Sequence, residues 1–201
     1  MKTLKQNKGL LVIVSSPSGG GKDSVIAGLM KIFPGSVDFV TTTTRPPRNE
    51  EKNGDDYRFV PKEQFEDMIK NNELIEHNLY AENYYGTERA KMEEALASHP
   101  IVFSNIEVNG KRNFDKAGFK HLSIFLLPES LEILKERIVK RGGLTQEKIA
   151  ARVAQAKKEI AESDIYDYRI YNRQGKLDEA VKKAAEIIRK HLPVDKKTEI
   201  S

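Results

Sequence analysis

The stretch that decides the fold runs from Leu10 to Ser24 and reads Leu-Leu-Val-Ile-Val-Ser-Ser-Pro-Ser-Gly-Gly-Gly-Lys-Asp-Ser. Its first part, Leu10–Val14, is apolar without alternation, which predicts a strand buried on both faces of a parallel sheet. After the glycine-rich turn, apolar residues return at helical spacing, and Pro34-Gly35 is expected to end that helix. Strand, glycine-rich turn and helix in this order open a βαβ unit.

The glycine-rich turn follows most of the phosphate-binding pattern G-x-x-x-x-G-K-[ST]. In that pattern, glycines let successive backbone N–H groups curl around a polyphosphate, the next helix adds its positive dipole end, and the lysine, here Lys22, reaches the outer phosphates. Two positions depart, because Ser16 stands at the first glycine and Asp23 at the metal-binding hydroxyl. The plain alternative is a βα turn that uses glycine only for geometry. We interpret the turn as an ATP phosphate site formed by Ser16, Pro17, Ser18, Gly19, Gly20, Gly21, Lys22, Asp23 and Ser24.

Later apolar runs predict further strands of the same sheet. Pro100–Ser104 and Leu122–Leu127 are continuous, and each is followed by a helical pattern. A short strand is expected near Tyr168–Tyr171 and a final helix over Leu177–His191. The alternation predicts an α/β fold, a three-layer αβα core with a parallel sheet and a phosphate loop.

Two segments interrupt the alternation. Residues 38–93 mix short strands with a helix, which predicts a small β-rich lobe beside the core. Residues 142–165 are rich in Ala, Lys, Glu and Arg with few apolar positions, which is typical of a mobile helical lid. The core is therefore expected to comprise 1–37, 94–141 and 166–192, and the polar residues 193–201 to be a disordered tail.

Composition excludes several classes of protein. With 38% hydrophobic and 32% charged residues among 201, the chain has the profile of a cored, soluble domain. No apolar run approaches the ~20 residues of a membrane span, and the polar N-terminus has no apolar signal-peptide region. The absence of cysteine excludes a disulfide scaffold and a thiolate site, and it fits the cytoplasm. A net charge of +4 is too small and too evenly spread to indicate a nucleic-acid partner.

A second motif carries phosphate chemistry. Thr41–Arg48 reads Thr-Thr-Thr-Thr-Arg-Pro-Pro-Arg, which sets Arg45 and Arg48 three apart on a backbone that prolines stiffen. Guanidinium groups bind phosphate through two parallel hydrogen bonds, and the threonine hydroxyls and the Tyr57 phenol can add donors. The alternative is a solvated loop that only carries charge.

At this point the chain resembles a known family. The two motifs above, together with Gly54-Asp-Asp-Tyr-Arg-Phe59, Leu74-Ile-Glu76 and Asn83-Tyr-Tyr-Gly-Thr87, are similar to the motifs of guanylate kinase. The resemblance covers roughly residues 9–190 in the same order and spacing, through the arginine-bearing segments around 137–152 to Asp167-Tyr168.

The resemblance implies transfer of the γ-phosphoryl group of ATP to GMP, and it implies a guanine site. Glu76 would accept from the guanine N1–H and exocyclic amine, and Thr87 would face O6. A carboxylate can accept from two adjacent ring donors, a pair that adenine does not offer. The phosphate of GMP would be held by Thr41, Arg45, Arg48, Tyr57 and Tyr85.

The resemblance also implies a catalytic set of cations and an adenine contact. Lid and hinge arginines would close on the ATP phosphates, while Asn172 would contact adenine. The cations expected to stabilise the transferring group are Lys22, Arg45, Arg137, Arg141 and Arg152.

Magnesium is the expected cofactor, and here the chain departs from the family. The usual Asp-x-Asp pair at a strand end reads Asn105-Ile-Glu107. An acid follows Lys22 and a neutral amide ends the strand. This exchange predicts that one carboxylate has moved across the metal, with Asp23 as the ligand.

Two other functions remain open from the sequence. The Gly-Lys-Asp-Ser segment also resembles ribose 1,5-bisphosphate phosphokinase, whose acceptor has no base and no need of Glu76. A guanylate-kinase-like domain that only binds protein partners is the other alternative, although such domains typically lose the phosphate loop. The expected partners are the small molecules ATP and GMP, with no membrane, and the sequence leaves monomer and homodimer open.

Overall fold

A computed structural model describes the chain except for residues 1–8, 49, 56, 81, 141 and 193–201, and its main sheet confirms the predicted parallel core. The expected disordered tail and Arg141 lie outside the described residues. All neighbouring strands of the main sheet pair in parallel. In spatial order they are β2 (Val37–Asp38), β7 (Ile101–Ser104), β1 (Leu10–Ser15), β8 (Leu122–Pro128) and β9 (Tyr168–Asn172).

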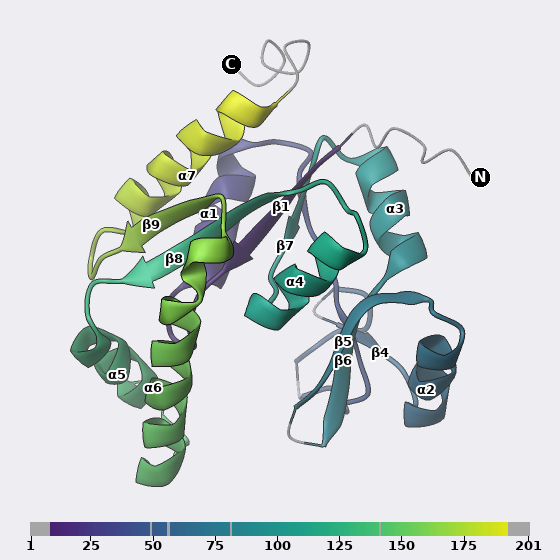
Figure 1. The fold of residues 1–201 in the computed structure, drawn as a ribbon, viewed down its shortest axis with the longest axis horizontal. Helices are drawn as coiled ribbons and strands as arrows, with labels where there is room; N and C mark the ends of the chain where they lie inside the picture. Colours follow the sequence, from purple (N-terminus) through teal and green to yellow (C-terminus); the bar gives the residue numbers. More distant parts are fainter. Residues whose placement is uncertain (1–8, 49, 56, 81, 141, 193–201) are drawn as a thin grey trace.

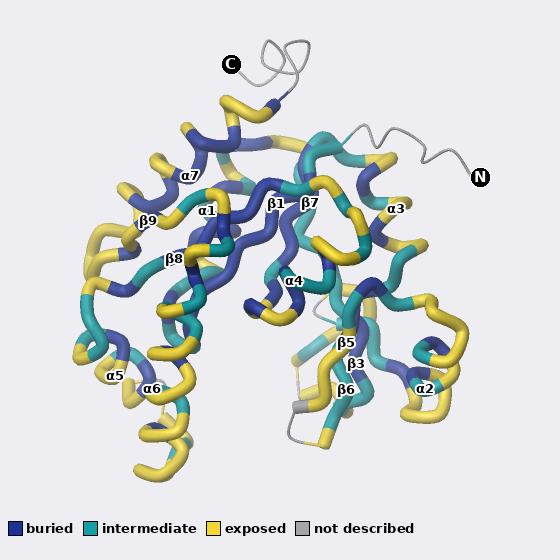
Figure 2. The backbone as a smooth tube through the Cα atoms, viewed as in Figure 1, coloured by how far each residue is buried: buried dark blue, intermediate teal, exposed yellow. Residues whose placement is uncertain are grey.

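Strand β1 occupies the middle of this sheet because both of its faces are apolar. Val12 and Val14 pack against one set of helices, and Leu11 and Ile13 pack against the other. All four side chains are buried, and Figure 2 shows the buried backbone concentrated in the central strands. The unalternating run is thus the sequence signal of a three-layer core.

Helices cover both faces of the main sheet (Figure 1). One face carries α1 (Lys22–Ile32) and α7 (Leu177–His191), whose apolar sides belong to one core cluster. The other face carries α3 (Arg89–Ser98) and α4 (Val108–Lys116), which belong to the second cluster. The last helix matches its predicted limits.

A second, mixed sheet stands apart from the core. Phe65 on α2 (Lys62–Lys70) stacks on Tyr84, with 5.2 Å between ring centroids and 9° between ring planes, so α2 is fastened to this sheet. The lobe is the expected β-rich one, although Thr42–Thr43 forms a buried strand where the sequence suggested a loop. In order the strands are β4 (Arg58–Phe59), β3 (Thr42–Thr43), β6 (Asn83–Glu88) and β5 (Leu74–Tyr80).

At both edges of the range 38–93 the chain contacts the core. Asp38 pairs with Phe103 in the main sheet, so it belongs to the core and not to the lobe. At the other edge, Met92 on α3 lies in the second core cluster.

The segment 142–165, predicted as a lid, is mostly helical and forms a helical hairpin with the helix that precedes it. Helix α5 (Leu131–Lys140) packs on α6 (Gln146–Ala161) through Leu134, Ile138 and Ile149. A short 3₁₀ turn, η1 (Ser163–Ile165), then leads into β9. Most of α6 is exposed, as its sparse apolar pattern predicted (Figure 2). No helix within the described residues is long and apolar enough to span a membrane.

The packing of α1 on α7 yields a test of the core. A Cβ on Gly28 would lie 2.7 Å from Cγ2 of Val181. In an open helix, Gly→Ala stabilises by about 1 kcal/mol, but here we expect Gly28→Ala to destabilise by about 1–3 kcal/mol through overpacking. In urea unfolding, Val181→Ala should relieve Gly28→Ala, so the double variant loses less than the sum of the two singles. A Gly28→Ala protein more stable than wild type would contradict this packing.

Candidate functional site

The functional side chains gather at the carboxyl edge of the main sheet, as is usual for open parallel sheets. The phosphate loop follows β1, the mixed-sheet lobe follows β2, Asn105 follows β7, and the α5–α6 hairpin follows β8. Figure 1 shows the lobe and the hairpin projecting on either side of α4 from this same edge.

The phosphate loop has the backbone geometry that its glycines predict. Gly19 and Gly21 have φ of 83° and 85°, a region that disfavours side chains. Ser16, at the first glycine of the pattern, is not among the described residues with positive φ, so its backbone does not require glycine. Gly21 precedes α1 without a side-chain cap, which leaves the first-turn N–H groups open to an anion.

Asn172 lies under the phosphate loop. Its buried amide donates to the carbonyl of Gly20 at 2.8 Å, and a Cβ on Gly21 would come within 2.5 Å of the same nitrogen. The Asn172 amide therefore fixes the backbone of the phosphate loop. The resemblance implied a different role for Asn172, a contact with adenine.

The hairpin brings two of the three expected arginines to this loop. Arg152 of α6 donates to the Ser18 hydroxyl at 3.2 Å. Arg137 of α5 donates to the backbone carbonyl of Asn172 at 3.1 Å and to the side chain of Gln174 at 2.9 Å. The third, Arg141, lies outside the described residues. Arg152 thus contacts the phosphate loop directly, whereas Arg137 contacts Asn172, whose side chain holds the loop.

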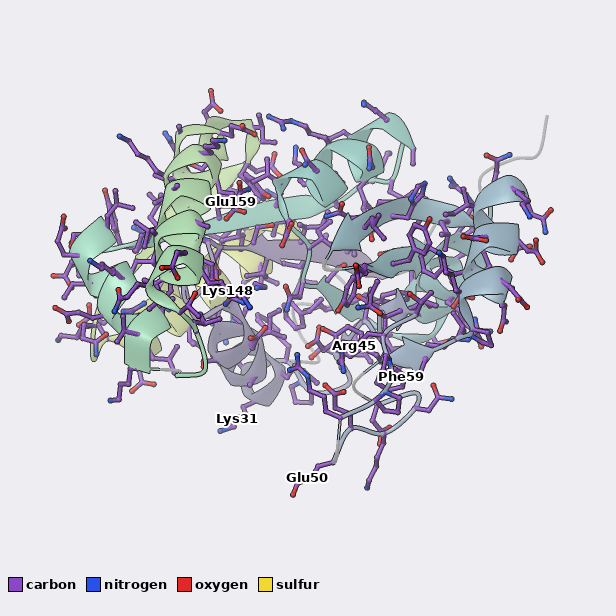
Figure 3. The ribbon with its side chains drawn as sticks, turned by 90° about the horizontal axis from the view of Figure 1, so that it is seen from below. Lys31, Arg45, Glu50, Phe59, Lys148 and Glu159 are labelled. Atoms are coloured by element: carbon purple, nitrogen blue, oxygen red, sulfur yellow. The ribbon has the colours of Figure 1, made fainter. Side chains whose placement is uncertain are left out.

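Glu159 of α6 is a partly buried acid that the sequence analysis did not single out. Burial raises the pKa of its carboxyl, a hydrogen bond from Gln155 opposes this, and the charges of Glu107 and Lys22 act on it in opposite directions. The hairpin therefore contributes an acid as well as arginines (Figure 3).

Asp23 and Asn105 meet, as the exchanged positions in the sequence suggested. The amide of Asn105 donates to Oδ1 of Asp23 at 2.7 Å, across 82 positions of sequence. Asp38 is the second acid beside Asp23 and was not singled out from the sequence. Its Oδ1 is buried and has no hydrogen-bond partner in the structure, and burial, followed by the charge of Asp23, raises its pKa to about 6.

The carboxylate oxygens of Asp23 and Asp38 are ligands of the type that a nucleotide-associated magnesium ion takes from a protein. Mg²⁺ is held by one or two carboxylates together with waters and substrate phosphates, and not by a complete protein cage. The described residues contain no cluster of three or more acidic or histidine ligands, but they do place an orphaned carboxylate oxygen of Asp38 beside Asp23.

The arginine motif forms a compact cationic site in the lobe. The Arg45 guanidinium lies 5.3 Å from the Tyr57 ring centroid and 5.6 Å from that of Phe59, and Tyr57 in turn packs on Tyr85. Figure 3 shows Arg45 and Phe59 together, whereas Glu50 projects into solvent. Three predicted phosphate ligands, Arg45, Tyr57 and Tyr85, therefore lie together.

Glu51 holds this site and was not identified from the sequence. Its carboxylate accepts from Arg45 Nη2 and from the Arg48 backbone N–H, both at 2.8 Å. The Arg48 backbone N–H, followed in effect by the Arg45 guanidinium, holds the pKa of Glu51 below its usual range. The side chain of Arg48 is exposed, and Thr41 contributes its carbonyl to the Arg58 N–H.

A largely buried acid, Glu76, lies on strand β5 of the lobe. The Thr87 hydroxyl donates to Oε1 of Glu76 at 2.7 Å, and these two residues are partners in the β5–β6 ladder. Burial raises the pKa of Glu76, the Thr87 hydrogen bond opposes the rise, and the charge of Glu107 adds to it. Since the Thr87 hydroxyl donates its hydrogen bond to Glu76, it orients this carboxylate.

A family model, curated proteins and a solved structure each relate this chain to guanylate kinases. The family model described as guanylate kinase matches residues 8–191. A guanylate kinase of Oceanobacillus iheyensis is 42% identical over 191 residues, which cover 92% of this chain and 88% of that protein. One from Lactobacillus delbrueckii subsp. bulgaricus is 41% identical over 168 residues, 83% of this chain and 82% of that one. The crystal structure of guanylate kinase from Anaplasma phagocytophilum aligns with a TM-score of 0.71 at 30% identity, covering 93% and 88% of the two chains.

The contact of Glu51 with Arg48 generates a prediction on the lobe itself. We expect Glu51→Gln to speed amide hydrogen exchange at Arg48 by about threefold or more, because a neutral amide oxygen is a weaker acceptor for the Arg48 N–H than the carboxylate is. Glu50→Gln, a neighbouring exposed site, is the matched control and should leave the exchange rate unchanged. Equal exchange rates in the two variants would show that Glu51 does not hold the loop.

Proposed function

The chain belongs to the guanylate kinase family, and we propose that its phosphate loop holds ATP while the mixed-sheet lobe holds GMP. The γ-phosphoryl group then passes from one to the other and gives ADP and GDP. The observation that carries this assignment is Glu76, a largely buried carboxylate oriented by Thr87 in the same lobe as the Arg45 site.

Glu76 supplies the chemistry that distinguishes guanine. When ionised, its carboxylate accepts from N1–H and the exocyclic amine together, and adenine has no such adjacent pair. The Thr87 hydroxyl bond fixes the carboxylate, so little ordering is left to be done on binding. The Thr87 hydroxyl has a single hydrogen to donate, so a hydrogen bond from Thr87 to guanine O6 would replace its bond to Glu76.

The GMP phosphate is assigned to the cationic site. Arg45 offers its guanidinium beside the phenols of Tyr57 and Tyr85, and Arg48 and Thr41 flank it in sequence. Glu51 already orients Arg45, which restricts the guanidinium to one direction. Phosphate and base would thus be held at separate points of one lobe.

The transferring group is assigned to cations from three elements. Lys22 begins α1, while Arg137 and Arg152 come from the hairpin. Arg141 is proposed for the same role from its sequence position alone, and Arg45 would approach from the acceptor side. Phosphoryl transfer asks the protein mainly for positioning and charge stabilisation, so these cations serve without a general base.

Mg²⁺ is proposed as the cofactor, with Asp23 as its protein ligand and Asn105 orienting that ligand. When bound, Mg²⁺ would offset the negative charge that develops on the phosphate groups. The cytoplasm is the proposed location, because both substrates are found there and the chain lacks cysteine.

The Lys22→Ala variant tests the phosphate loop. We expect kcat to fall by about 10³-fold or more, by analogy with other phosphoryl-transfer cations, while the dissociation constant for GMP stays near that of wild type. Lys31→Ala, at the exposed far end of α1, is the matched control. A Lys22→Ala enzyme that keeps a tenth of the wild-type activity would show that the phosphate loop does not act in catalysis.

The Glu76→Gln variant tests guanine recognition. An amide turns an N–H toward the guanine donors, and an unpaired buried group costs about 1–3 kcal/mol, so kcat/KM for GMP should fall about ten- to a hundredfold. Because burial raises the Glu76 pKa, protonation should raise the wild-type KM for GMP as pH falls, at a higher pH than an ordinary glutamate would.

Glu76→Gln should lose this pH dependence, whereas Glu73→Gln, an exposed site on the same lobe, should keep it. Unchanged GMP efficiency in Glu76→Gln would refute the role of Glu76 as the guanine acceptor.

A further inference from the structure

The guanidinium of Arg137 is held at two points by the turn between β9 and α7. Its Nε donates to Oε1 of Gln174 at 2.9 Å, and its Nη2 donates to the backbone carbonyl of Asn172 at 3.1 Å. Nε and Nη2 form one edge of the planar group, so the two bonds fix its plane. They use two of the five N–H donors of an arginine and leave the others for an anion.

The turn that carries Gln174 is fixed by its own backbone. The Gln174 N–H donates to Oε2 of Glu129, directly after β8, at 3.3 Å. The Lys176 N–H donates to the Arg173 carbonyl at 3.2 Å, which closes the turn, and Gly175 has a φ of 70°, a region that favours glycine. The side chain of Gln174 therefore extends from a backbone that the protein already holds in place.

The phosphate loop touches both of the elements that Arg137 joins. The side chain of Asn172 donates to the carbonyl of Gly20 at 2.8 Å. A second contact comes from α5, because a Cβ on Gly19 would lie 3.2 Å from Cγ1 of Ile138, the residue after Arg137. The bonds from Arg137 to the β9–α7 turn therefore connect α5 to the turn that supports the loop.

We propose that Gln174 is a positioning residue, which directs the Arg137 guanidinium toward the nucleotide phosphates by holding its Nε. The proposal rests on the proposed function to the extent that Arg137 stabilises the transferring group. A single hydrogen bond to the Asn172 carbonyl would let the guanidinium rotate, and the second bond, to Gln174, removes this freedom. A cation that is already oriented loses less side-chain entropy when it meets the phosphates.

Two substitutions of Gln174 separate its hydrogen bond from its bulk. Gln174→Met keeps the length of the side chain and removes the acceptor, whereas Gln174→Glu keeps acceptor oxygens at the same length. With ATP and GMP, we expect Gln174→Met to lower kcat about three- to tenfold. KM for GMP should stay within twofold of wild type, because GMP is assigned to the other lobe.

The conservative variant and a matched control complete this comparison. Gln174→Glu should keep at least half of the wild-type kcat. Gln146→Met places the same substitution at the exposed start of α6 and should leave kcat unchanged. Wild-type kcat in Gln174→Met, or a Gln174→Glu enzyme as slow as Gln174→Met, would overturn the proposal.

A double-mutant cycle tests whether Gln174 acts through Arg137. Arg137→Ala should lower kcat by itself, and adding Gln174→Met to it should cause less than a twofold further loss, because the group that Gln174 holds is gone. If Gln174→Met lowered kcat by the same factor with and without Arg137, Gln174 would act elsewhere and the positioning role would be wrong.

Hydrogen exchange of the Arg137 side chain tests the contact without any substrate. In the substrate-free full chain, followed by nuclear magnetic resonance, we expect the Arg137 Nε–H to exchange about threefold faster or more in Gln174→Met than in wild type. Gln174→Glu should keep the wild-type rate. Gln174 is exposed, so all variants should melt at the wild-type temperature. Equal exchange rates in wild type and Gln174→Met would contradict the contact.

Failure of the positioning role is distinguishable from failure of the proposed function. Phosphorylation of GMP by wild type is measured separately. An Arg137 Nε–H whose slow exchange depends on Gln174, in an enzyme that does not phosphorylate GMP, would refute the acceptor assignment and support the contact. GMP phosphorylation that Gln174→Met leaves unchanged would support the proposed function and overturn the positioning role.

Discussion

Burial of β1 on both faces is the constraint on which the rest of the structure depends. Helices cover both faces of this strand, so the polar phosphate loop lies outside the core, at the carboxyl end of β1. There the chain turns into α1. The neighbouring strands are parallel to β1, so their carboxyl ends meet at the same edge. The lobe, the hairpin and Asn105 each come directly after the carboxyl end of one of these strands. A single packing requirement thus sets the donor and acceptor sites next to each other.

The sequence predicted the parts of the molecule where one local signal dominates. Continuous apolar runs gave the buried strands β1 and β8, and an amphipathic pattern gave α7 with its observed limits. The glycine positions gave the phosphate loop, because a positive φ at Gly19 and Gly21 is a local backbone demand. Short strands carry no such signal. The pairs Val37–Asp38 and Thr42–Thr43 become strands only through partners that are distant in the chain.

Side-chain partnerships were the other part that the sequence could not supply. Glu51 is one acid among several in a polar loop, and only folding shows that it bridges Arg45 and Arg48. Asp38 was read as the first residue of the lobe, and its position over α1 depends on strand pairing with β7. The Asn105–Asp23 bond is the exception, since the exchange of an acid and an amide between two motif positions was visible in the sequence.

Several side chains of the site are already oriented by hydrogen bonds within the protein: Glu51 holds Arg45, and Thr87 holds Glu76. The specificity of the site depends on recognition of guanine by the lobe. The most direct measurement is kcat/KM with ATP for three acceptors, GMP, AMP and ribose 1,5-bisphosphate, followed by ADP release. A site with buried groups that must be paired rejects an acceptor lacking them by orders of magnitude, so we expect GMP to be favoured by about 10³-fold or more. Equal or better use of AMP or ribose 1,5-bisphosphate would contradict this account.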